Sequence, residues 1–312
     1  MSSYRFCRTD DIGLLVDALN RCWAPHFPDE PPMTPAAFKR SIRDLQVWCS
    51  SCMVAFSGSD PIGVLIGAKR PSATLILRVA VHPDHVRQGH GRHLLESLGS
   101  KLAILGPPRI VAEVPETLGP ACAFFSARGY VQEALLTDYV LHGEEYDTRT
   151  WLPPSGGSSS APAGTADGAA RQFVIPVTVD DLTANDLLGE AHTQTCWERS
   201  VEALNARKDD LAGLAVASDE QIEAYILYTG GAAQEPAAAG PGARRRTAEI
   251  VSLRSFVEDG GARLKLLLSR LGAATFRFPK VHPADISVEC LGTLGFRPAG
   301  SHRVYTARAR AV

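Results

Sequence analysis

The sequence has 312 residues, which is enough for two domains of ordinary size. Hydrophobic residues make up 45% and charged residues 21%, as in soluble globular proteins, and a formal net charge of −2 excludes a global basic field that would attract nucleic acid. No apolar run is long enough to span a bilayer, and the N-terminal stretch MSSYRFCRTDD has acidic residues where a signal peptide has its apolar core. We therefore expect a cytoplasmic protein without a nucleic-acid or membrane partner.

The first half of the chain begins with a predicted strand at 4–8 and a helix that Asp10 or Asp11 caps. Thr34 and Pro35 supply the N-cap and the first residue of a second helix. The next predicted elements are strands at 47–56, 62–68 and 74–81, a helix from about Gly91, a strand at 109–114, a helix at 121–127 and a strand at 135–141. One β-α-β unit among antiparallel neighbours predicts an α+β fold with a mixed, mostly antiparallel sheet flanked by helices.

The cysteines do not indicate a metal or redox centre. There are seven, an odd and scattered set that fits reduced thiols better than a disulfide framework. Cys49 and Cys52 have the spacing of a metal or redox pair, but they lie in a predicted strand, where a three-residue offset points side chains to opposite faces. No second pair of suitable spacing follows, so we expect no metal.

The chain divides at a stretch rich in Pro, Gly, Ser and Ala, which predicts a flexible linker at 151–170 between domains at 1–150 and 171–312. The second domain repeats the element order of the first, with a long loop at 230–246. Some residues also recur at one fixed separation: Gly129, Tyr130 and Tyr139 correspond to Gly295, Phe296 and Tyr305. The sequence therefore predicts an internal duplication.

The most informative segment, LILRVAVHPDHVRQGHGRHLL, spans residues 75–95. A predicted strand ends at Val81, a tight loop follows, and Gly89 and Gly91 open an amphipathic helix. The first amides of a helix lack internal partners and carry the positive end of its dipole, and glycines let a phosphate approach them. The segment lacks the Gly-Lys-Ser/Thr of a Walker loop, and Leu94 breaks the pattern of a dinucleotide fold. It predicts a diphosphate site, the alternative being a strand-to-helix turn without a ligand.

This segment resembles the GNAT superfamily of N-acetyltransferases, whose pattern is V-x-P-x-x-[QR]-x-x-G-x-[GA] before a helix. Val81, Pro83, Gly89 and Gly91 are in register, and Val86 departs from the pattern. The resemblance implies two tandem GNAT-like domains and a site for acetyl-CoA in the first. The implied cofactor-binding residues are Val79, Val81, Val86, Arg87, Gln88, Gly89, His90, Gly91, Arg92 and Phe125.

A second segment, 114–130, resembles the later family pattern N-x-x-A-x-x-[FY]-Y-x-x-x-G-[FY]. Leu118 replaces its asparagine, and Phe125 replaces the tyrosine that commonly protonates the departing thiolate. In the chemistry that the resemblance implies, the strand amide near Val79–Val81 stabilises the oxyanion. An alkyl ammonium with a pKa near ~10.4 needs a proton acceptor, and Glu113 is the predicted base. The alternative for Glu113 is a surface carboxylate at a strand end.

Two polar groups near this segment have open interpretations. His82, His85, His90 and His93 either fill an exposed loop or, in the case of His90 and His93, add positive charge near a pyrophosphate. Residues 23–30 lie where the family often shapes its acceptor pocket, and acidic residues there would suit a cationic amine. A plain surface loop is the alternative.

The corresponding segment of the second domain has lost most of the motif. It lacks V-x-P, its loop is shorter, and Glu258 and Asp259 place negative charge before Gly260 and Gly261, where it would repel a pyrophosphate. Leu291 occupies the tyrosine position. The second domain is therefore predicted to be a degenerate copy that no longer binds CoA.

The sequence thus predicts an N-acetyltransferase that moves an acetyl group from acetyl-CoA to the amine of a small molecule or peptide in its N-terminal domain. The alternatives are a non-catalytic acyl-CoA-binding or regulatory protein and an interaction scaffold without a ligand. We expect a monomer or a homodimer. The sequence does not identify the acceptor, because specificity in such folds is set by variable loops.

Overall fold

The computed structural model describes residues 2–143, 173–188, 196–230 and 247–310. These residues form two compact units. The first unit consists of Met1–Leu135 and His302–Val312, and the second of Leu136–Ser301. The predicted linker at 151–170 and nearly all of the predicted loop at 230–246 lie outside the described residues.

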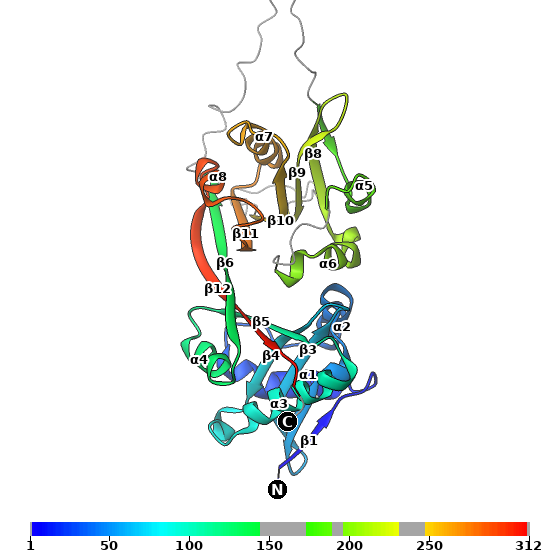
Figure 1. The fold of residues 1–312 in the computed structure, drawn as a ribbon, viewed down its shortest axis with the longest axis vertical. Coiled ribbons are helices and arrows are strands. Elements are labelled where there is room, and N and C mark those ends of the chain that lie inside the picture. The colour runs from blue at the N-terminus through cyan, green and yellow to red at the C-terminus, as the bar shows by residue number, and fades with distance from the viewer. Residues whose placement is uncertain (1, 144–172, 189–195, 231–246, 311–312) are drawn as a thin grey trace, which may run out of the picture. The chain divides into compact units, whose positions relative to one another are not determined.

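The described residues of the first unit form a mixed sheet in which β4 (Thr74–Val81) and β5 (Arg109–Pro115) are the one parallel pair, and Figure 1 shows its strands. The strands before this pair are β1 (Ser2–Phe6), β2 (Met53–Ser57) and β3 (Asp60–Lys69). They lie in the order β1-β2-β3-β4-β5, antiparallel up to β4 and parallel between β4 and β5. The predicted mixed, mostly antiparallel sheet is confirmed.

Helices flank this sheet in the first unit. They are α1 (Ile12–Cys22), α2 (Pro35–Leu45), α3 (His90–Leu105) and α4 (Gly119–Ala127). Leu94, Leu98 and Leu102 recur at helical spacing on α3 and are buried in one core with Ala55 of β2 and Leu65 of β3. This packing fixes the start of α3 beside the end of β4.

The helix caps match the predictions in part. Thr34 Oγ1 accepts a hydrogen bond from the amide of Ala37 at 3.1 Å, so the predicted cap of α2 is confirmed. Asp11 precedes α1, but its carboxylate makes no capping bond to that helix. It instead pairs with the Arg5 guanidinium at 2.7 Å and accepts a bond from the amide of Arg8.

The predicted strand at 47–56 is wrong in its first part. Cys49–Ser51 form a short 3-10 turn, and β2 begins only at Met53. The carbonyl oxygen of Trp48 accepts hydrogen bonds from the Ser51 amide at 2.7 Å and from the Cys52 thiol at 3.3 Å, which closes the turn. Both Cys49 and Cys52 are buried as free thiols, and burial raises their pKa.

A β-bulge splits β4 from β5. Ile66 of β3 pairs with Arg78 and Gly67 pairs with Ile76, so Leu77 is an extra residue in β4. β4 then pairs with β5 only at its first two residues, Thr74 and Leu75. Beyond this point the two parallel strands are no longer hydrogen-bonded to each other, and their carboxyl ends are free to line a binding site.

The second unit repeats this architecture. Its elements are β7 (Phe173–Pro176), α5 (Val179–Ala184), α6 (Val201–Ala206), β8 (Ala212–Ala217), β9 (Ile222–Thr229), β10 (Thr247–Ser255), α7 (Ala262–Leu271), β11 (Thr275–Val281) and α8 (Val288–Thr293). β10 has a register shift at Val251 and pairs in parallel with β11 only over its first residues, as β4 does with β5. Two copies of one α+β fold are therefore present, as predicted.

The last strand of each copy passes into the other unit. β6 (Val131–His142) pairs with β11 from Thr137 onward, and β12 (Arg297–Arg308) pairs with β5 from His302 onward. Tyr139 consequently lies in the core of the second unit and its counterpart Tyr305 in the core of the first. The predicted ranges 1–150 and 171–312 kept each last strand with its own half, and the structure distributes them differently.

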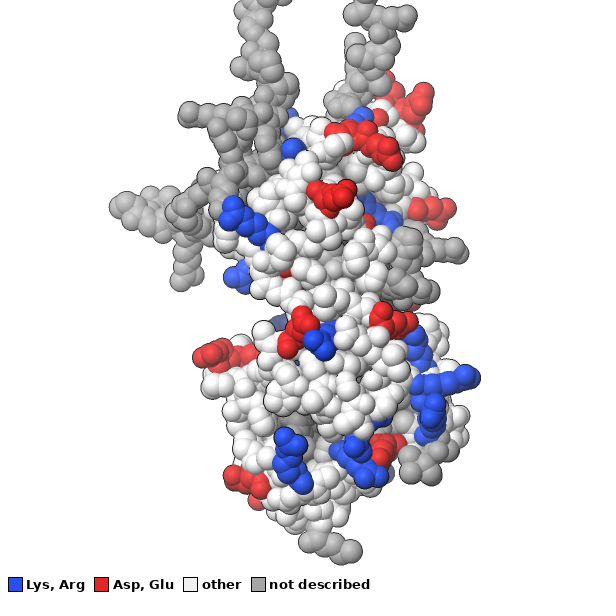
Figure 2. Space-filling view, turned by 60° about the vertical axis from the view of Figure 1, so that its left-hand side comes forward, with Lys and Arg blue, Asp and Glu red and all other residues white. Residues whose placement is uncertain are grey.

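The surface agrees with the low net charge. Figure 2 shows Lys and Arg side chains interspersed with Asp and Glu on the visible face. Within the described ranges, no helix has both the length and the apolar character needed to cross a membrane.

Candidate functional site

A cavity of about 840 Å³ lies in the first unit, where β4 and β5 separate. Every predicted cofactor-binding residue except Gln88 lines it, and so does the predicted base Glu113. Gln88 instead donates a side-chain hydrogen bond to the carbonyl of Asp84 at 3.2 Å. The cavity therefore brings together residues from β4, the loop before α3, β5 and α4.

The loop before α3 leaves a row of backbone amides open. Gly89 caps the helix with a φ of 90°, a conformation that favours glycine, and Arg87 is also left-handed with a φ of 65°. The amide of Val86 bonds to Pro83 and that of His93 to Gly89. The intervening amides, from Arg87 to Arg92, donate to no acceptor among the described residues, and we call them the open amides. These amides lie at the positive end of the dipole of a helix that is 16 residues long.

Gly91 lies in a tight place in the wall of the cavity. A Cβ at this position would lie 3.3 Å from Cζ of Phe124 and 3.7 Å from Cγ2 of Val81. Both neighbours line the cavity. A larger side chain would therefore displace its wall next to the open amides.

The four histidines do not behave as a group. His90 is buried, and its Nδ1 lies 2.6 Å from the hydroxyl of Tyr4. Burial and the neighbouring His85 and His93 lower the pKa of His90, which disfavours a positive charge there. The interpretation of His90 as exposed filling is thus wrong, because a contact from β1 encloses it. His93 is exposed and packs against Tyr4 in a tilted arrangement, with ring centroids 3.9 Å apart.

Phe125 occupies the position of the usual acid and fills a hydrophobic site. It packs edge-on against Tyr130 at 5.2 Å and stacks with Tyr305 at 5.8 Å between ring centroids. Burial strongly raises the pKa of Tyr130, and neither tyrosine lines the cavity. Within the described residues the lining contains no tyrosine, serine, threonine or cysteine.

Glu113 is the only acidic residue that lines the cavity among those the structure describes. It is half-buried on β5, and its neighbour across the sheet is Val304 of β12. Glu113 lies on β5 beyond the point where β4 and β5 separate, whereas Val79 and Val81 lie on β4 beyond the same point. This arrangement suits a base that faces a substrate held between the two strands.

The opposite wall combines Trp23 and Phe27, from the segment 23–30 that was predicted to lie near an acceptor pocket, with Arg78, which was not predicted. The Arg78 guanidinium lies over the Trp23 ring at 4.8 Å, and its Nη2 is 3.3 Å from Oε2 of Glu30. Trp23 stacks on Phe27 at 4.3 Å and donates from Nε1 to the same Glu30 oxygen at 3.0 Å. Glu30 does not line the cavity, whereas Arg78 does. An arginine inside the apolar strand LILRVAV was the signal that could have identified Arg78.

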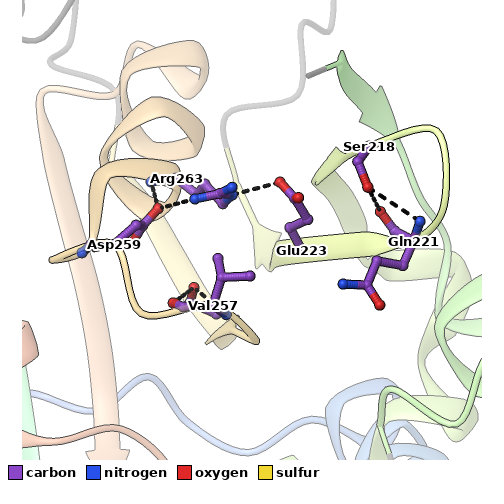
Figure 3. Close-up of polar contacts among 8 residues, drawn as sticks. Ser218, Gln221, Glu223, Val257, Asp259 and Arg263 are labelled. Atoms are coloured by element: carbon purple, nitrogen blue, oxygen red, sulfur yellow. Dashed lines mark hydrogen bonds and ion pairs between the residues drawn. The ribbon is translucent and has the colours of Figure 1, made fainter. Parts of the chain in front are cut away.

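In the second unit, amides at the start of the corresponding helix α7 are already hydrogen-bonded to a side chain. Gly261 caps α7 with a φ of 83°, as Gly89 caps α3. Asp259 Oδ1 accepts a hydrogen bond from the Gly261 amide, and Oδ2 accepts one from the Arg263 amide, each at 2.9 Å. Arg263 Nη1 also donates to Oδ2 at 2.8 Å, and its Nε donates to Glu223 of β9 at 2.6 Å (Figure 3).

These contacts give the carboxylate of Asp259 the role that a bound anion would have. Burial alone would raise the pKa of Asp259, but its hydrogen bonds to Arg263 and to the two amides lower it, so the group is charged. A cavity of only about 60 Å³ is found in this unit, lined by residues that include Arg199, Tyr225 and Arg254. The second unit thus keeps the fold of the first without an open site at the start of its helix.

Comparisons with known proteins point to one family. The sequence profile of the Acetyltransferase (GNAT) family matches residues 14–130. A solved tandem GNAT protein from the clavulanic acid biosynthesis pathway is 17% identical, with a TM-score of 0.58 over 99% of both chains. A GCN5-related N-acetyltransferase from Sphaerobacter thermophilus is 13% identical, with a TM-score of 0.60 over 99% of this chain and 96% of that one.

A further GCN5-related N-acetyltransferase, from Anabaena variabilis, is 12% identical with a TM-score of 0.60, covering 99% of this chain and 73% of that one. At these identities the structural likeness shows a shared fold. No curated protein matches the sequence. The profile match takes in β4, the loop with the open amides, and α4, so the sequence family and the cavity coincide.

Proposed function

We propose that this chain, which belongs to the acetyltransferase (GNAT) family through residues 14–130, transfers an acetyl group from acetyl-CoA to an amine in its first unit. The observation that carries the proposal is the row of open amides from Arg87 to Arg92, beside a cavity of about 840 Å³. A diphosphate has acceptor oxygens for such amides, and the helix dipole favours its charge.

The second unit supports the choice of the first as the catalytic one. Its equivalent amides, those of Gly261 and Arg263, already donate to Asp259. A pyrophosphate would have to displace a charged carboxylate that Arg263 also holds. We therefore assign acetyl-CoA to the first unit alone.

The lining residues suggest how the reaction proceeds. The arginines Arg87, Arg92 and Arg128 line the cavity and add positive charge for the phosphates. The amide of β4 near Val79–Val81 stabilises the oxyanion that forms on the thioester carbonyl. The amine nitrogen attacks the carbonyl carbon, Glu113 accepts the proton that the nitrogen gives up, and the C–S bond breaks to leave an acetamide and a thiolate.

The thiolate does not need a tyrosine to depart. A thiol has a pKa of roughly 8.5, so its anion is a fair leaving group and water can protonate it. This matters because Phe125 has no hydroxyl and the described lining contains no phenol. Catalysis in this site then depends on binding, on the oxyanion contact and on the base.

The second candidate is a non-catalytic acyl-CoA-binding protein, and the same lack of a phenol favours it. The two are separated by incubating the full chain with acetyl-CoA and a panel of amines. The enzyme releases CoA thiol and forms an N-acetyl product, followed with a thiol reagent and by mass spectrometry. Binding of acetyl-CoA without release with any amine would support the alternative.

The proposal also covers the compartment, the acceptor and the oligomeric state. All seven cysteines are free thiols, which fits the cytoplasm as the compartment. The acceptor is an amine of a small molecule or peptide, and no metal takes part. The chain works as a monomer or a homodimer, which sedimentation of the purified protein would distinguish.

A further inference from the structure

The wall of the cavity formed by Trp23, Phe27 and Arg78 has chemistry that bears on the acceptor, and the inference drawn from it rests on the proposed function. These residues come from the segment after α1 and from β4, away from the open amides at the start of α3. Glu113, the proposed base, lies on β5 across the split between the strands. An acceptor between the two strands would therefore have this wall on one side and the base on the other.

The guanidinium of Arg78 lacks a full set of anionic contacts. Burial lowers its pKa, and the charge of Glu30 opposes that shift. The single ion-pair contact, from Nη2 to Oε2, is long at 3.3 Å, and that oxygen also accepts from the Trp23 indole. The side chain of Arg78 keeps 27% of its surface exposed, so a ligand in the cavity can reach it. A guanidinium with donors to spare is suited to bind a carboxylate through two parallel hydrogen bonds.

The charge of the lining supports an anionic acceptor. The arginines that line the cavity are Arg78, Arg87, Arg92 and Arg128, and Glu113 is the only described acidic residue in the lining. Outside the lining, Glu96 pairs with Arg92 at 2.7 Å. The three arginines other than Arg78 lie on the loop, on α3 and just after α4, where phosphates of the cosubstrate would use them. Glu30, for which a role in attracting a cationic amine was one of two open interpretations, is held by Trp23 and Arg78 outside the lining. A purely cationic acceptor would face Arg78, whose charge Glu30 offsets through one long contact.

The aromatic pair gives the wall its second property. Trp23 and Phe27 stack at 4.3 Å with an interplanar angle of 21°, and both line the cavity. A flat apolar surface of this kind favours the apolar part of a ligand. Arg78 lies against the same Trp23 ring, so the apolar surface and the positive charge are adjacent.

We propose that the acceptor is a small amine that also carries a carboxylate, of the amino-acid class with an apolar side chain. Arg78 binds the carboxylate, Trp23 and Phe27 contact the apolar side chain, and Glu113 accepts the proton of the amine. Arg78 is then a specificity-determining residue that contacts the substrate.

Matched ligands test this inference directly. Leucine and phenylalanine are each compared with their carboxamides, by calorimetric titration into the full chain with and without saturating CoA, and by kcat/KM with acetyl-CoA. The acids should bind at least about tenfold more tightly than the carboxamides, a difference of about 1.4 kcal/mol. The ammonium of a carboxamide loses its proton more readily, so amine reactivity cannot produce this preference.

Variants show whether the preference comes from Arg78. Arg78→Gln should remove it, whereas Arg21→Gln, a matched change at an exposed ion pair with Asp60, should retain it. Glu30→Gln should retain or increase it, because it frees the guanidinium. If Arg78 only held the segment after α1 through Glu30, the Glu30→Gln and Arg78→Gln variants would behave alike, and the inference would be overturned.

The outcomes also separate this inference from the proposed function. Turnover of amines without a preference for the acid, or no binding of either form, overturns the inference and leaves the acetyl-CoA site standing. Tight binding of the acids without release of CoA thiol supports the inference and contradicts the catalytic proposal. A preference that survives in Arg78→Gln contradicts the role of Arg78.

Discussion

Glu113 is the residue on which the proposed chemistry depends most. Replacing it with glutamine keeps the size of the side chain but removes the proton acceptor, so kcat should fall by about 100- to 10,000-fold. Affinity for acetyl-CoA should stay within a factor of two or three, since the loop before α3 is unchanged. Steady-state kinetics and calorimetry of the same preparation measure the two quantities.

The matched control is Glu116→Gln, which removes a carboxylate just after β5 that pairs with Arg303 and does not line the cavity. It should keep kcat near that of the parent protein. An unchanged kcat in Glu113→Gln would mean that another group or water takes the proton.

Some residues of the site could be predicted from sequence and others could not. Gly89 and Gly91 were found because a close backbone approach and a left-handed cap require glycine, and such needs show in a short pattern. The burial of His90 depends on Tyr4, and the position of Arg78 depends on Trp23, each far away in the sequence. Contacts of that kind arise only from the packed fold and leave no local pattern.

At the scale of elements, the starts of α3 and α7 show how one architecture yields an open and a closed site. Both helices follow a left-handed glycine, but only the loop before α7 contains a carboxylate that bonds to the first amides. From the sequence, Glu258 and Asp259 are both predicted to repel a phosphate. The structure distinguishes them, because Glu258 is exposed and Asp259 accepts hydrogen bonds from the amides at the start of α7.

Replacing Asp259 with alanine tests this difference. The free energy of unfolding at pH 7 should fall by about 1–2 kcal/mol, the usual loss when a side chain that accepts from the first amides of a helix is removed. The folded pKa of Asp259 is lowered, so its stabilising contribution is complete above its unfolded pKa of about 3.9 and is lost as pH falls. The difference between parent and variant should therefore shrink in acid. Denaturant titrations from pH 7 to 3 measure it.

The control is Glu258→Ala, which should change stability by less than about 0.5 kcal/mol, as exposed substitutions usually do. Equal effects of the two substitutions would contradict the assignment of Asp259 as the internal anion of α7.

The elements themselves were largely predictable, and the failures have physical causes. The predicted bounds of β4 and β5 agree with the structure to within one residue because each is an apolar run with turn signals on both sides. The strand expected at 47–56 is interrupted because the Trp48 carbonyl closes a turn that competes with extended structure. The β4 bulge at Leu77 could not be predicted, since a register shift depends on the partner strand.

At the scale of the whole chain, the exchanged last strands decide which residues stabilise which unit. Tyr305 belongs to the second copy by sequence but is only 2% exposed in the core of the first unit, stacked on Phe125. Tyr139 belongs to the first copy but lies in the core of the second unit. An assignment based on the linear order of the repeats misses this exchange, because the duplicated sequences fit either unit.

Replacing these tyrosines tests the exchange. Tyr305→Ala should destabilise the first unit by about 3 kcal/mol, as truncation of a buried aromatic residue does, and should raise hydrogen exchange in β5. Tyr139→Ala should raise exchange in β11 and leave acetyl-CoA affinity nearly unchanged. Ile104→Ala, at a residue 79% exposed, is the control. Faster exchange in β11 from Tyr305→Ala, with β5 protected, would show that each last strand stays with its own copy.

The central claim is that one acetyl-CoA binds per chain, at the open amides of the first unit, and calorimetric titration of acetyl-CoA into the full chain tests it most directly. We predict one site in the parent protein, in Asp259→Ala and in Gly99→Ala, a change on α3 where a Cβ meets only the Arg310 carbonyl oxygen at 3.9 Å. We predict none in Gly91→Val, which should remain folded, because its side chain would press on Phe124 beside the amides. Two sites per chain, or unchanged affinity in Gly91→Val, would contradict the account.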